Sequence, residues 1–237
     1  MKGIILAGGR GTRLYPMTLT IPKPLVTVRD KPLLNYSVQM FVDHGIDNIK
    51  IIIRSSDLSE YKKWLDIYSD SFLNTNISFE EEFEPMGTLG YIINHLYDWI
   101  HNEDVFITNS DDIKIPDLTA MRAFQKKNNM LATVVLTEID NPEEYGVASL
   151  NNGVVTGFFE KEKNPLSNLI STGVYLISPV VWDMNFYTKE KKNLMIENDL
   201  LPHLVKEKKL GGFLYKGPFF DCGTPARLEK AIKEVNF

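Results

Sequence analysis

The chain has 237 residues and a formal net charge of −5, with 43% hydrophobic and 24% charged residues. This length and balance allow one large α/β domain with a packed core and are typical of soluble globular proteins. The net negative charge argues against general affinity for nucleic acid or an anionic membrane, so a site for a polyanion must be a local cluster of Arg and Lys.

Targeting signals and cysteine chemistry are also constrained by the sequence. No apolar run approaches the ~18 residues that span a bilayer, and Met1 is followed so closely by a strand pattern that a signal peptide has no room. We therefore expect a cytoplasmic protein. Cys222 is the single cysteine, which excludes an internal disulfide and a cysteine-based zinc site, and we expect it to be a small buried residue.

The first predicted element is a buried parallel strand, Lys2–Leu6, followed by a glycine-rich stretch. Gly8, Gly9 and Gly11 leave the backbone free to adopt positive φ and to approach a ligand, so that successive N–H groups can point at phosphate oxygens. Arg13 and, ten residues on, Lys23 add cationic side chains. Because open α/β sheets bind ligands at the carboxyl ends of their strands, the stretch predicts a triphosphate-binding loop.

Two better-known phosphate loops do not fit this stretch. The Walker pattern requires Lys directly after its last glycine, and Thr12 follows Gly11. The dinucleotide pattern G-x-G-x-x-G begins at Gly9, but its third glycine falls on Leu14. Both a kinase-type P-loop and a Rossmann cofactor site are therefore excluded.

Residues 6–18, LAGGRGTRLYPMT, and residues 22–25, PKPL, resemble the signature of the sugar-1-phosphate nucleotidylyltransferases, L-A-G-G-x-G-T-R-L-x-P-x-T followed by P-K-P-L. In that family a nucleoside triphosphate and a sugar 1-phosphate give a nucleotide-sugar and pyrophosphate. The resemblance implies catalytic roles for Arg13 and Lys23. It also implies that the nucleotide is bound by the loop residues Leu6, Ala7, Gly8, Gly9, Gly11, Thr12 and Arg13.

The next elements alternate between helix and strand. Apolar residues at helical spacing predict a helix over residues 34–42 that ends at Gly45, and residues 49–53 form a second strand pattern. A second helix follows residues 57–60, and residues 77–81 read as a third strand. This β-α-β-α-β order predicts a Rossmann-like, mostly parallel sheet flanked by helices, which is an α/β fold.

Residues 84–90, EPMGTLG, form a turn that opens a helix. The corresponding P-x-G-T-x-G segment of the family contacts the nucleotide base, which implies nucleotide-binding roles for Gly87 and Thr88. The segment looks most like the P-L-G-T-A-G of mannose 1-phosphate guanylyltransferases. The resemblance thus favours GTP over dTTP or UTP.

An apolar strand pattern over residues 104–108 ends in Asn109, Ser110, Asp111 and Asp112. Carboxylates at a strand end suit Mg²⁺, which binds one or two of them together with substrate phosphates. The family has N-G-D here, so the resemblance implies that Asp111 is a metal ligand. Ser110 replaces the glycine, which leaves Asp112 as an alternative, and ordinary turn chemistry also explains such a pair.

Residues 117–128 read as a helix and residues 131–138 as a strand, and the pattern then changes. Residues 144–148, 153–159 and 170–178 predict strands separated by turns, without intervening helices. We expect a single nucleotidyltransferase domain over residues 1–237. Residues 1–130 form its nucleotide-binding half, and residues 131–237 form a smaller, β-rich half for the sugar phosphate.

Three short segments of that second half resemble the sugar-phosphate side of the family. They imply sugar-phosphate binding by Gly146, Glu160, Lys161 and Thr172. In the family an E-K-P segment supplies a carboxylate for sugar hydroxyls and a lysine for the phosphate. Glu162 stands where the proline is expected, so Lys163 is an alternative to Lys161, and a solvated charge run also explains the segment.

The last part of the chain contains residues 197–202 at the start of an amphipathic helix, a strand over 212–215, and the sequence FFDCGTP at 219–225. Thr224 as N-cap and Pro225 at the first position predict a final helix over 226–235. The D-x-G-T-P of the family carries the second metal carboxylate, which implies that Asp221 is a ligand. No hexapeptide repeat follows, so we expect a minimal catalytic domain.

These observations lead to one principal hypothesis and two alternatives. The principal hypothesis is a Mg²⁺-dependent enzyme that uses GTP and mannose or manno-heptose 1-phosphate. The first alternative is a thymidylyl- or uridylyltransferase acting on glucose 1-phosphate, and the second is a non-catalytic nucleotide-sugar sensor. The expected partners are the two substrates and, as an open possibility, further copies of the chain, but neither nucleic acid nor a membrane.

Overall fold

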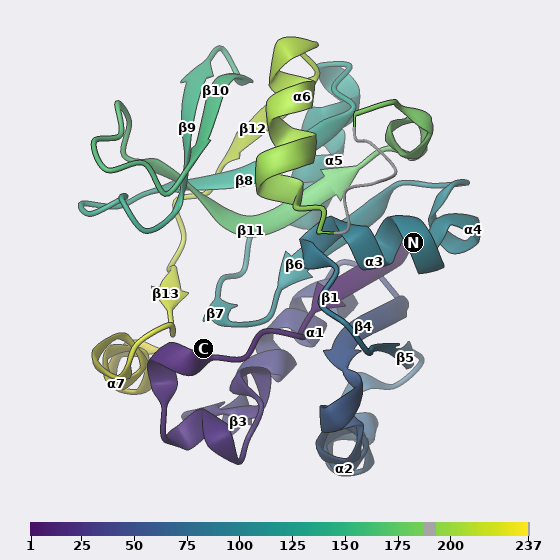
Figure 1. Cartoon of the computed structure of the whole chain (residues 1–237), viewed down its shortest axis with the longest axis vertical. Coiled ribbons are helices and arrows are strands. Elements are labelled where there is room, and N and C mark those ends of the chain that lie inside the picture. Colours follow the sequence, from purple (N-terminus) through teal and green to yellow (C-terminus); the bar gives the residue numbers. More distant parts are fainter. Residues whose placement is uncertain (187–192, 237) are drawn as a thin grey trace. The chain divides into compact units, whose positions relative to one another are not determined.

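The computed structural model of the chain describes residues 1–186 and 193–236 (Figure 1). It divides into two compact units. Unit 1 comprises Met1–Glu84, Thr108–Ile115 and Gly217–Phe237, and unit 2 comprises Pro85–Ile107 and Pro116–Lys216. Strand β6 (Val105–Asn109) continues from unit 2 into unit 1. None of the described helices is long and apolar enough to span a bilayer.

Unit 1 is built on a parallel sheet whose strands are ordered β5 (Asn76–Glu82), β4 (Asn48–Arg54) and β1 (Lys2–Leu6). Ile4 and Ile5 are fully buried, as expected for a strand covered on both faces. The unit also contains α1 (Leu33–Asp43), α2 (Leu58–Tyr68), β2 (Thr27–Val28), β3 (Lys31–Pro32), and short 3₁₀ helices at Thr12–Leu14, Met17–Leu19, Lys23–Leu25, Ser55–Asp57 and Ser69–Phe72.

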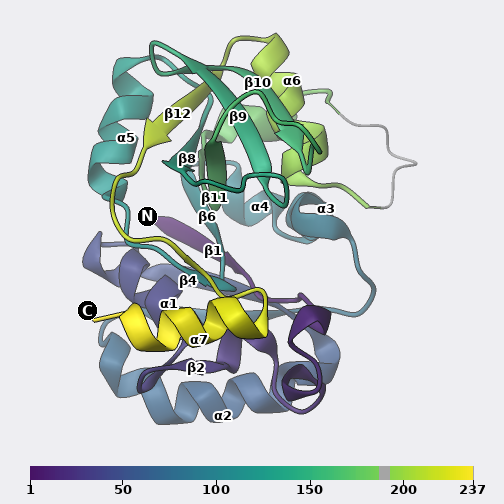
Figure 2. The ribbon, with the colours of Figure 1, turned by 90° about the vertical axis from the view of Figure 1, so that its left-hand side faces the viewer.

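The last segment of the chain completes unit 1. Strand β13 (Phe220–Asp221) pairs antiparallel with β7 (Asp112–Ile113), and α7 (Pro225–Glu234) follows it. Figure 2 shows α7, in yellow, beside β2 of the same unit. The two share a core cluster that contains fully buried Cys222, which confirms the expectation for that residue.

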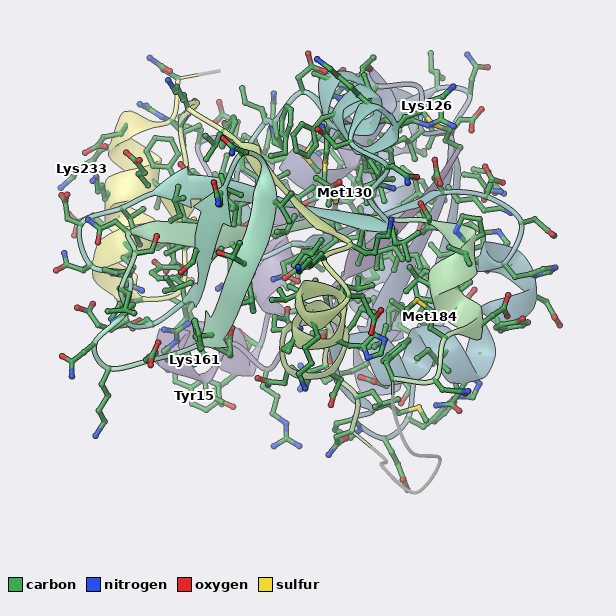
Figure 3. The ribbon with its side chains drawn as sticks, turned by 90° about the horizontal axis from the view of Figure 1, so that it is seen from above. Tyr15, Lys126, Met130, Lys161, Met184 and Lys233 are labelled. Carbon is green, nitrogen blue, oxygen red and sulfur yellow. The ribbon has the colours of Figure 1, made fainter. Side chains whose placement is uncertain are left out.

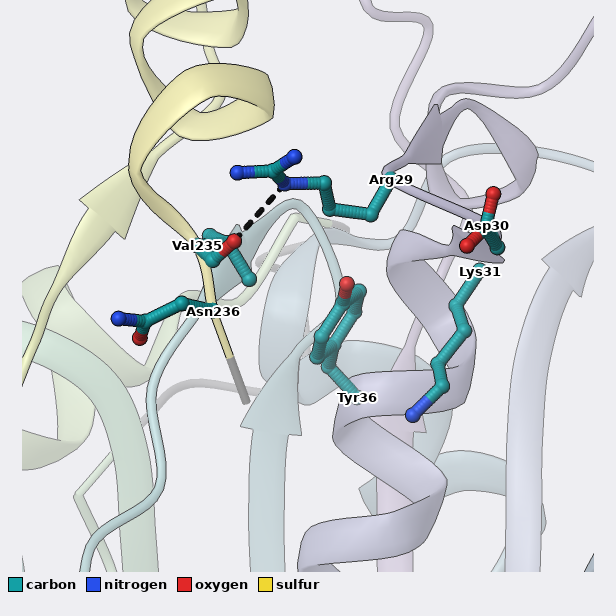
Figure 4. Close-up of a pocket in the computed structure, with 6 residues that line it drawn as sticks. All are labelled: Arg29, Asp30, Lys31, Tyr36, Val235 and Asn236. Atoms are coloured by element: carbon teal, nitrogen blue, oxygen red, sulfur yellow. Dashed lines mark hydrogen bonds between the residues drawn. The ribbon is translucent and has the colours of Figure 1, made fainter.

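Arg29 fixes the end of α7. Its Nε donates to the carbonyl of Val235 at 2.9 Å and its Nη2 to that of Lys233 at 2.7 Å (Figure 4). The last carbonyl groups of a helix have no partner within the helix, so a guanidinium placed there satisfies them and interacts favourably with the helix dipole. These contacts line one side of a pocket whose other residues include Lys31 and Tyr36.

Unit 2 combines helices with a mixed sheet whose strands are ordered β11-β8-β12-β10-β9. The pair β8 and β12 is parallel, and the other neighbouring pairs are antiparallel. The elements in chain order are α3 (Gly87–His95), α4 (Tyr97–Ile100), α5 (Leu118–Lys127), β8 (Ala132–Glu138), β9 (Gly146–Asn151), β10 (Val154–Glu160), β11 (Leu169–Ile177), a 3₁₀ helix (Pro179–Asp183), a π-helical turn (Ile196–Leu200), α6 (Leu201–Lys206) and β12 (Leu210–Leu214).

The α/β class expected from the sequence is confirmed, with a parallel sheet in unit 1 and a β-rich unit 2. Two features differ from the expectation. The helix expected from residue 197 begins as a π-helical turn before α6. Strand β12 lies between β8 and β10, an insertion that local sequence patterns do not reveal. The expected division near residue 130 concerns substrates rather than chain contacts, and it stays a prediction.

Candidate active site

The glycine-rich loop begins where β1 ends. Ala7 still belongs to the sheet, because its N–H donates to Ile52 and its carbonyl accepts from the Tyr61 hydroxyl at 3.0 Å. Among the described residues, the N–H groups of Gly8 and Gly9 donate to no acceptor. Free backbone donors of this kind at the end of a parallel strand are what a phosphate group requires.

Gly11 is held in a conformation that only glycine adopts without strain. Its φ is +60°, and a Cβ on it would lie 2.9 Å from the Cβ of Lys23. Its carbonyl accepts from the Thr18 hydroxyl at 2.7 Å. The loop therefore packs closely on the segment that carries Lys23, while Thr12 and Arg13 remain exposed.

Lys23 lies in a 3₁₀ helix, and its side chain is only 7% exposed. Its Nζ donates to Oδ2 of Asp111 at 2.8 Å, whose side chain is 48% exposed. Loss of hydration raises the pKa of Asp111, but the charge and hydrogen bond of Lys23 outweigh it and hold the pKa below its ordinary value. The structure thus brings together a cation and a carboxylate that lie 88 residues apart.

Asp112 has a different environment from its neighbour. Its side chain is 12% exposed and binds the ammonium of Lys114, which is 1% exposed and also donates to the carbonyl of Asn109 at 2.9 Å. Burial raises the pKa of Asp112 to about 7, against the opposing charge of Lys114. Ser110, at the glycine position of the family, is fully buried and donates to the carbonyl of Leu6 at 2.8 Å.

Asp221 reaches this region through β13, in which it lies directly opposite Asp112 of β7. Its Oδ1 accepts from the N–H of Gly223 at 2.6 Å, and its Oδ2 accepts from Arg227 at 2.7 Å. A Cβ on Gly223 would lie 2.9 Å from Nη2 of Arg13. The D-x-G-T-P segment therefore carries a carboxylate and also leaves room for the guanidinium of Arg13.

The carboxylates of unit 1 suit a magnesium ion in number and type. The register of β13 on β7 brings Asp221 to the turn that carries Asp111. Among the described residues no group of three or more His, Cys, Asp or Glu side chains is arranged to hold a metal ion.

Gly87 and Thr88 lie in unit 2 and contact the segment before α6. The φ of Gly87 is +81°, and a Cβ there would lie 2.2 Å from the carbonyl oxygen of Leu194, so no other residue fits. The Thr88 hydroxyl donates to Glu197 at 2.9 Å and accepts from the N–H of Ile196 at 2.8 Å. Two segments more than 100 residues apart are thereby fixed together.

Three of the residues expected to bind sugar phosphate lie at the end of the β9–β10 pair, whereas Thr172 lies in β11. A Cβ on Gly146 would lie 2.8 Å from Oε2 of Glu160, so the absence of a side chain makes room for that carboxylate. Lys161, labelled in Figure 3, has φ of +54° and a side chain that is 69% exposed. Its Nζ lies 3.4 Å from Oε1 of Glu160. Lys163 is exposed too. Thr172 is buried, and its hydroxyl donates to the carbonyl of Val135 at 3.3 Å.

Sequence reasoning assigned no role to Lys114, Arg227, Glu197 and Tyr175, which belong to these clusters. Glu197 accepts from Thr88 and also from the hydroxyl of Tyr175 at 3.0 Å. Burial, with a contribution from Glu197, raises the pKa of Tyr175 well above its ordinary value. Glu197 shares its segment with Asn198 and Asp199, so it does not stand out in the sequence, and nothing in the sequence marks Lys114 as buried.

Comparisons with known proteins give consistent results. A family model described as nucleotidyl transferase matches residues 2–236. The mannose-1-phosphate guanyltransferase of Yarrowia lipolytica is 34% identical over 233 residues, covering 95% of this chain and 61% of the relative. That of Saccharomyces cerevisiae is 33% identical over 237 residues, with 95% and 62% covered. The chain therefore spans about three fifths of the length of the curated relatives it matches.

Solved structures support the same fold. A Bacillus anthracis protein assigned as a glucose-1-phosphate thymidylyltransferase, in complex with sucrose, has a TM-score of 0.88 and 26% identity. The match covers 100% of this chain and 97% of that one. A UDP-glucose pyrophosphorylase complexed with UDP-glucose has a TM-score of 0.80 at 23% identity, covering 98% and 97%, and shows the fold alone.

Proposed function

Because the chain belongs to the nucleotidyl transferase family, we propose that it transfers a nucleotidyl group from a nucleoside triphosphate to a sugar 1-phosphate and releases pyrophosphate. The observation that carries this proposal is the buried Lys23 beside Asp111, where a glycine-rich loop leaves N–H groups free. A fixed cation, a carboxylate and free backbone donors suit the binding and reaction of a triphosphate.

Unit 1 supplies the residues for the nucleotide. We assign the β- and γ-phosphates to Arg13 and the loop N–H groups, and the α-phosphate to Lys23. An oxygen of the sugar phosphate attacks the α-phosphorus as the bond to pyrophosphate breaks, so negative charge develops where Lys23 lies. Because a sugar phosphate is already anionic at neutral pH, the reaction requires no general base, and positioning and charge neutralisation supply the rate.

We further propose that Asp111 and Asp221 hold Mg²⁺. When bound, the ion would neutralise negative charge on the phosphates during the transfer. Asp221 is already oriented by the Gly223 N–H and by Arg227, which restricts its rotamers before a metal binds. Both aspartates pair with a lysine, but Asp111 is 48% exposed and accessible to a metal, whereas Asp112 is 12% exposed beside the buried Lys114.

For unit 2 we propose contacts to the sugar phosphate and to the base. Lys161 is exposed and can bind the acceptor phosphate, while Glu160 can accept hydrogen bonds from sugar hydroxyls. Gly87 and Thr88 are assigned to the nucleotide base. The carbonyl of Leu194 fills the space beside Gly87, so the assignment to the base rests on the resemblance of this segment to the family's P-x-G-T-x-G.

The proposed substrates are GTP and mannose 1-phosphate. Both sequence relatives are mannose-1-phosphate guanyltransferases, and they match 95% of this chain. The Bacillus anthracis structure supports a second candidate pair, dTTP and glucose 1-phosphate, at lower identity. A site built to hydrogen-bond guanine would discriminate against a pyrimidine by about tenfold to hundredfold, because its polar groups would be left unpaired.

The test is pyrophosphate release by the purified chain with Mg²⁺, over a matrix of nucleoside triphosphates and sugar 1-phosphates that includes a manno-heptose 1-phosphate. We expect the highest kcat/KM for GTP with a manno-configured sugar. A preference for dTTP with glucose 1-phosphate would replace the substrates but keep the reaction. If no pair of substrates is turned over but the chain still binds a nucleotide-sugar, the result would favour the sensor hypothesis over the enzyme hypothesis.

A further inference from the structure

Three carboxylates lie on β7, β13 and the residue before β7, and each is paired with a different cation. Asp111 pairs with Lys23 at 2.8 Å and Asp221 with Arg227 at 2.7 Å, while Asp112 pairs with Lys114. The first two carboxylates are the metal ligands of the proposed function, and Lys23 is its principal cation. Arg227 orients Asp221, so Lys114 is the one of these three cations to which the proposed function gives no role.

Lys114 is placed unusually for a lysine. Its side chain is 1% exposed, and its Nζ binds Oδ1 of Asp112 and the carbonyl of Asn109. A buried lysine is costly unless its charge is paired and its protons are bound; here the charge is paired with Asp112, and two acceptors are provided for its three N–H groups. The two contacts tie together the beginning and the end of the turn that carries Asp111.

The partner of Lys114 is the carboxylate that would otherwise disturb the site. Asp112 is adjacent to Asp111 in the chain and directly opposite Asp221 across the β7–β13 pair. Side chains directly opposite each other lie on the same face of a sheet, and like charges there repel. Without a cation of its own, Asp112 would compete with Asp111 for Lys23 and for a metal.

We propose that Lys114 is a positioning residue that withholds Asp112 from the metal site and keeps Asp111 beside Lys23. This inference rests on the proposed function. According to this inference, the buried Lys114 determines which of the two adjacent aspartates, Asp111 or Asp112, is available to the metal. Lys114 is only 1% exposed and binds Asp112, so we assign its effect on the site to the position of Asp112.

The decisive experiment compares Lys114→Met, Lys114→Arg and the double variant Lys114→Met/Asp112→Asn. We expect Lys114→Met to lower kcat by about tenfold or more with smaller changes in KM, because Lys23 is drawn from Asp111. Lys114→Arg should retain part of the activity. The double variant should recover most of kcat, because the competing charge is gone.

Metal binding gives a readout that does not depend on turnover. EPR-detected Mn²⁺ binding with GTP, without a sugar phosphate, should tighten about threefold or more in Lys114→Met, since a positive charge is lost beside the site. It should return to the wild-type value in the double variant. A lower kcat together with tighter Mn²⁺ binding would indicate displaced carboxylates. General destabilisation of the fold would instead lower both kcat and the affinity for Mn²⁺.

Lys50→Met is the matched control, because Lys50 forms a part-buried pair with Glu80 between β4 and β5 of the same unit. It should lower the melting temperature without changing kcat or Mn²⁺ binding. The inference is overturned if the double variant is no more active than Lys114→Met, or if Mn²⁺ binding weakens in parallel with stability. If the wild type releases no pyrophosphate, the proposed function fails, whereas the Mn²⁺ comparison still decides the role of Lys114.

Discussion

Units 1 and 2 both carry a lysine beside a carboxylate, but the two pairs differ in freedom. Lys23 is 7% exposed and donates to Asp111 at 2.8 Å, so its ammonium has one available position. Lys161 is 69% exposed and lies 3.4 Å from Glu160, with a backbone in the left-handed region. One cation is fixed before any ligand arrives, and the other is free to move toward one.

The difference matches two different chemical tasks. A charge that must stabilise a developing negative charge is most effective when it is oriented in advance, because no reorganisation is then needed during the reaction. A cation that binds a soluble anion benefits from a flexible, exposed side chain that can extend toward the anion. The side chain loses conformational entropy when it binds. We therefore expect substitutions of Lys23 to act mainly on kcat and those of Lys161 mainly on KM.

The largest expected effect is that of Lys23→Ala. Removal of one preorganised donor to a developing charge should lower kcat by about 10²–10³-fold with a smaller change in KM. Steady-state kinetics for both substrates, beside thermal melts, would measure this. If the KM of this variant rises while its kcat is unchanged, Lys23 contributes to binding the nucleotide and not to stabilising the transition state. Lys23 and Lys161 would then not differ in their roles.

The next effect is that of the metal carboxylates. Asp111→Asn and Asp221→Asn should each lower kcat by about a hundredfold and raise the Mg²⁺ concentration needed for half-maximal rate, since each loses a charged oxygen ligand. Magnesium titrations of turnover are the measurement. Asp112→Asn serves as the comparison and should change kcat less than Asp111→Asn. The reverse order would make Asp112 the ligand.

A smaller effect separates the two substrates. Arg13→Ala should raise KM for the nucleotide, and Lys161→Ala should raise KM for the sugar phosphate. Each increase should correspond to a loss of about 1.5–3 kcal/mol of binding free energy, because one charge-assisted contact is lost. The experiment varies each substrate at saturation of the other. If Lys163→Ala, and not Lys161→Ala, gives the acceptor defect, the sequence register of this segment is shifted and the free cation of unit 2 is Lys163.

The smallest effect concerns pH. Burial raises the pKa of Glu160, the charge of Lys161 opposes this, and Glu197 adds to the rise. The folded state thus holds this proton more tightly than the unfolded state, so stability falls as pH rises through the raised pKa. Glu160→Gln should melt a few degrees above the wild type at pH 8 and equally with it at pH 4. Exposed Glu162→Gln is the control, for which no such difference is expected.

The sequence predicted most regular elements because their signals are local. The apolar run of β1, the glycine after α1 and the N-cap at Thr224, which accepts from the N–H of Arg227 at 3.3 Å, each depend on a few neighbouring residues. The glycine-rich loop was equally clear, because closely spaced glycines are a local signal, and one of them, Gly11, has φ of +60°. Each of these features is determined by residues that are close to it in the sequence.

The remaining features arise from contacts between distant segments. The β7–β13 pair is two residues long on each side and joins positions more than 100 residues apart, so no periodic pattern announces it. Lys114 looks like an ordinary surface lysine in the sequence, but it is buried in the folded chain. Glu197 likewise joins the site through Thr88, 109 residues away. The positioning network could not be predicted because its partners become neighbours only after folding.

The order of the three segments of unit 1 determines when that unit can be completed during translation. Residues 1–84 and 108–115 supply the glycine-rich loop and β7, but β13 follows only after residues 116–216. At about 5–20 residues per second, synthesis of that insertion delays β13 by roughly 5–20 seconds. Throughout this interval β7 has no strand to pair with, and Arg13 has no Gly223 to lie against. The nascent chain can therefore finish unit 2 while unit 1 still waits for its last strand.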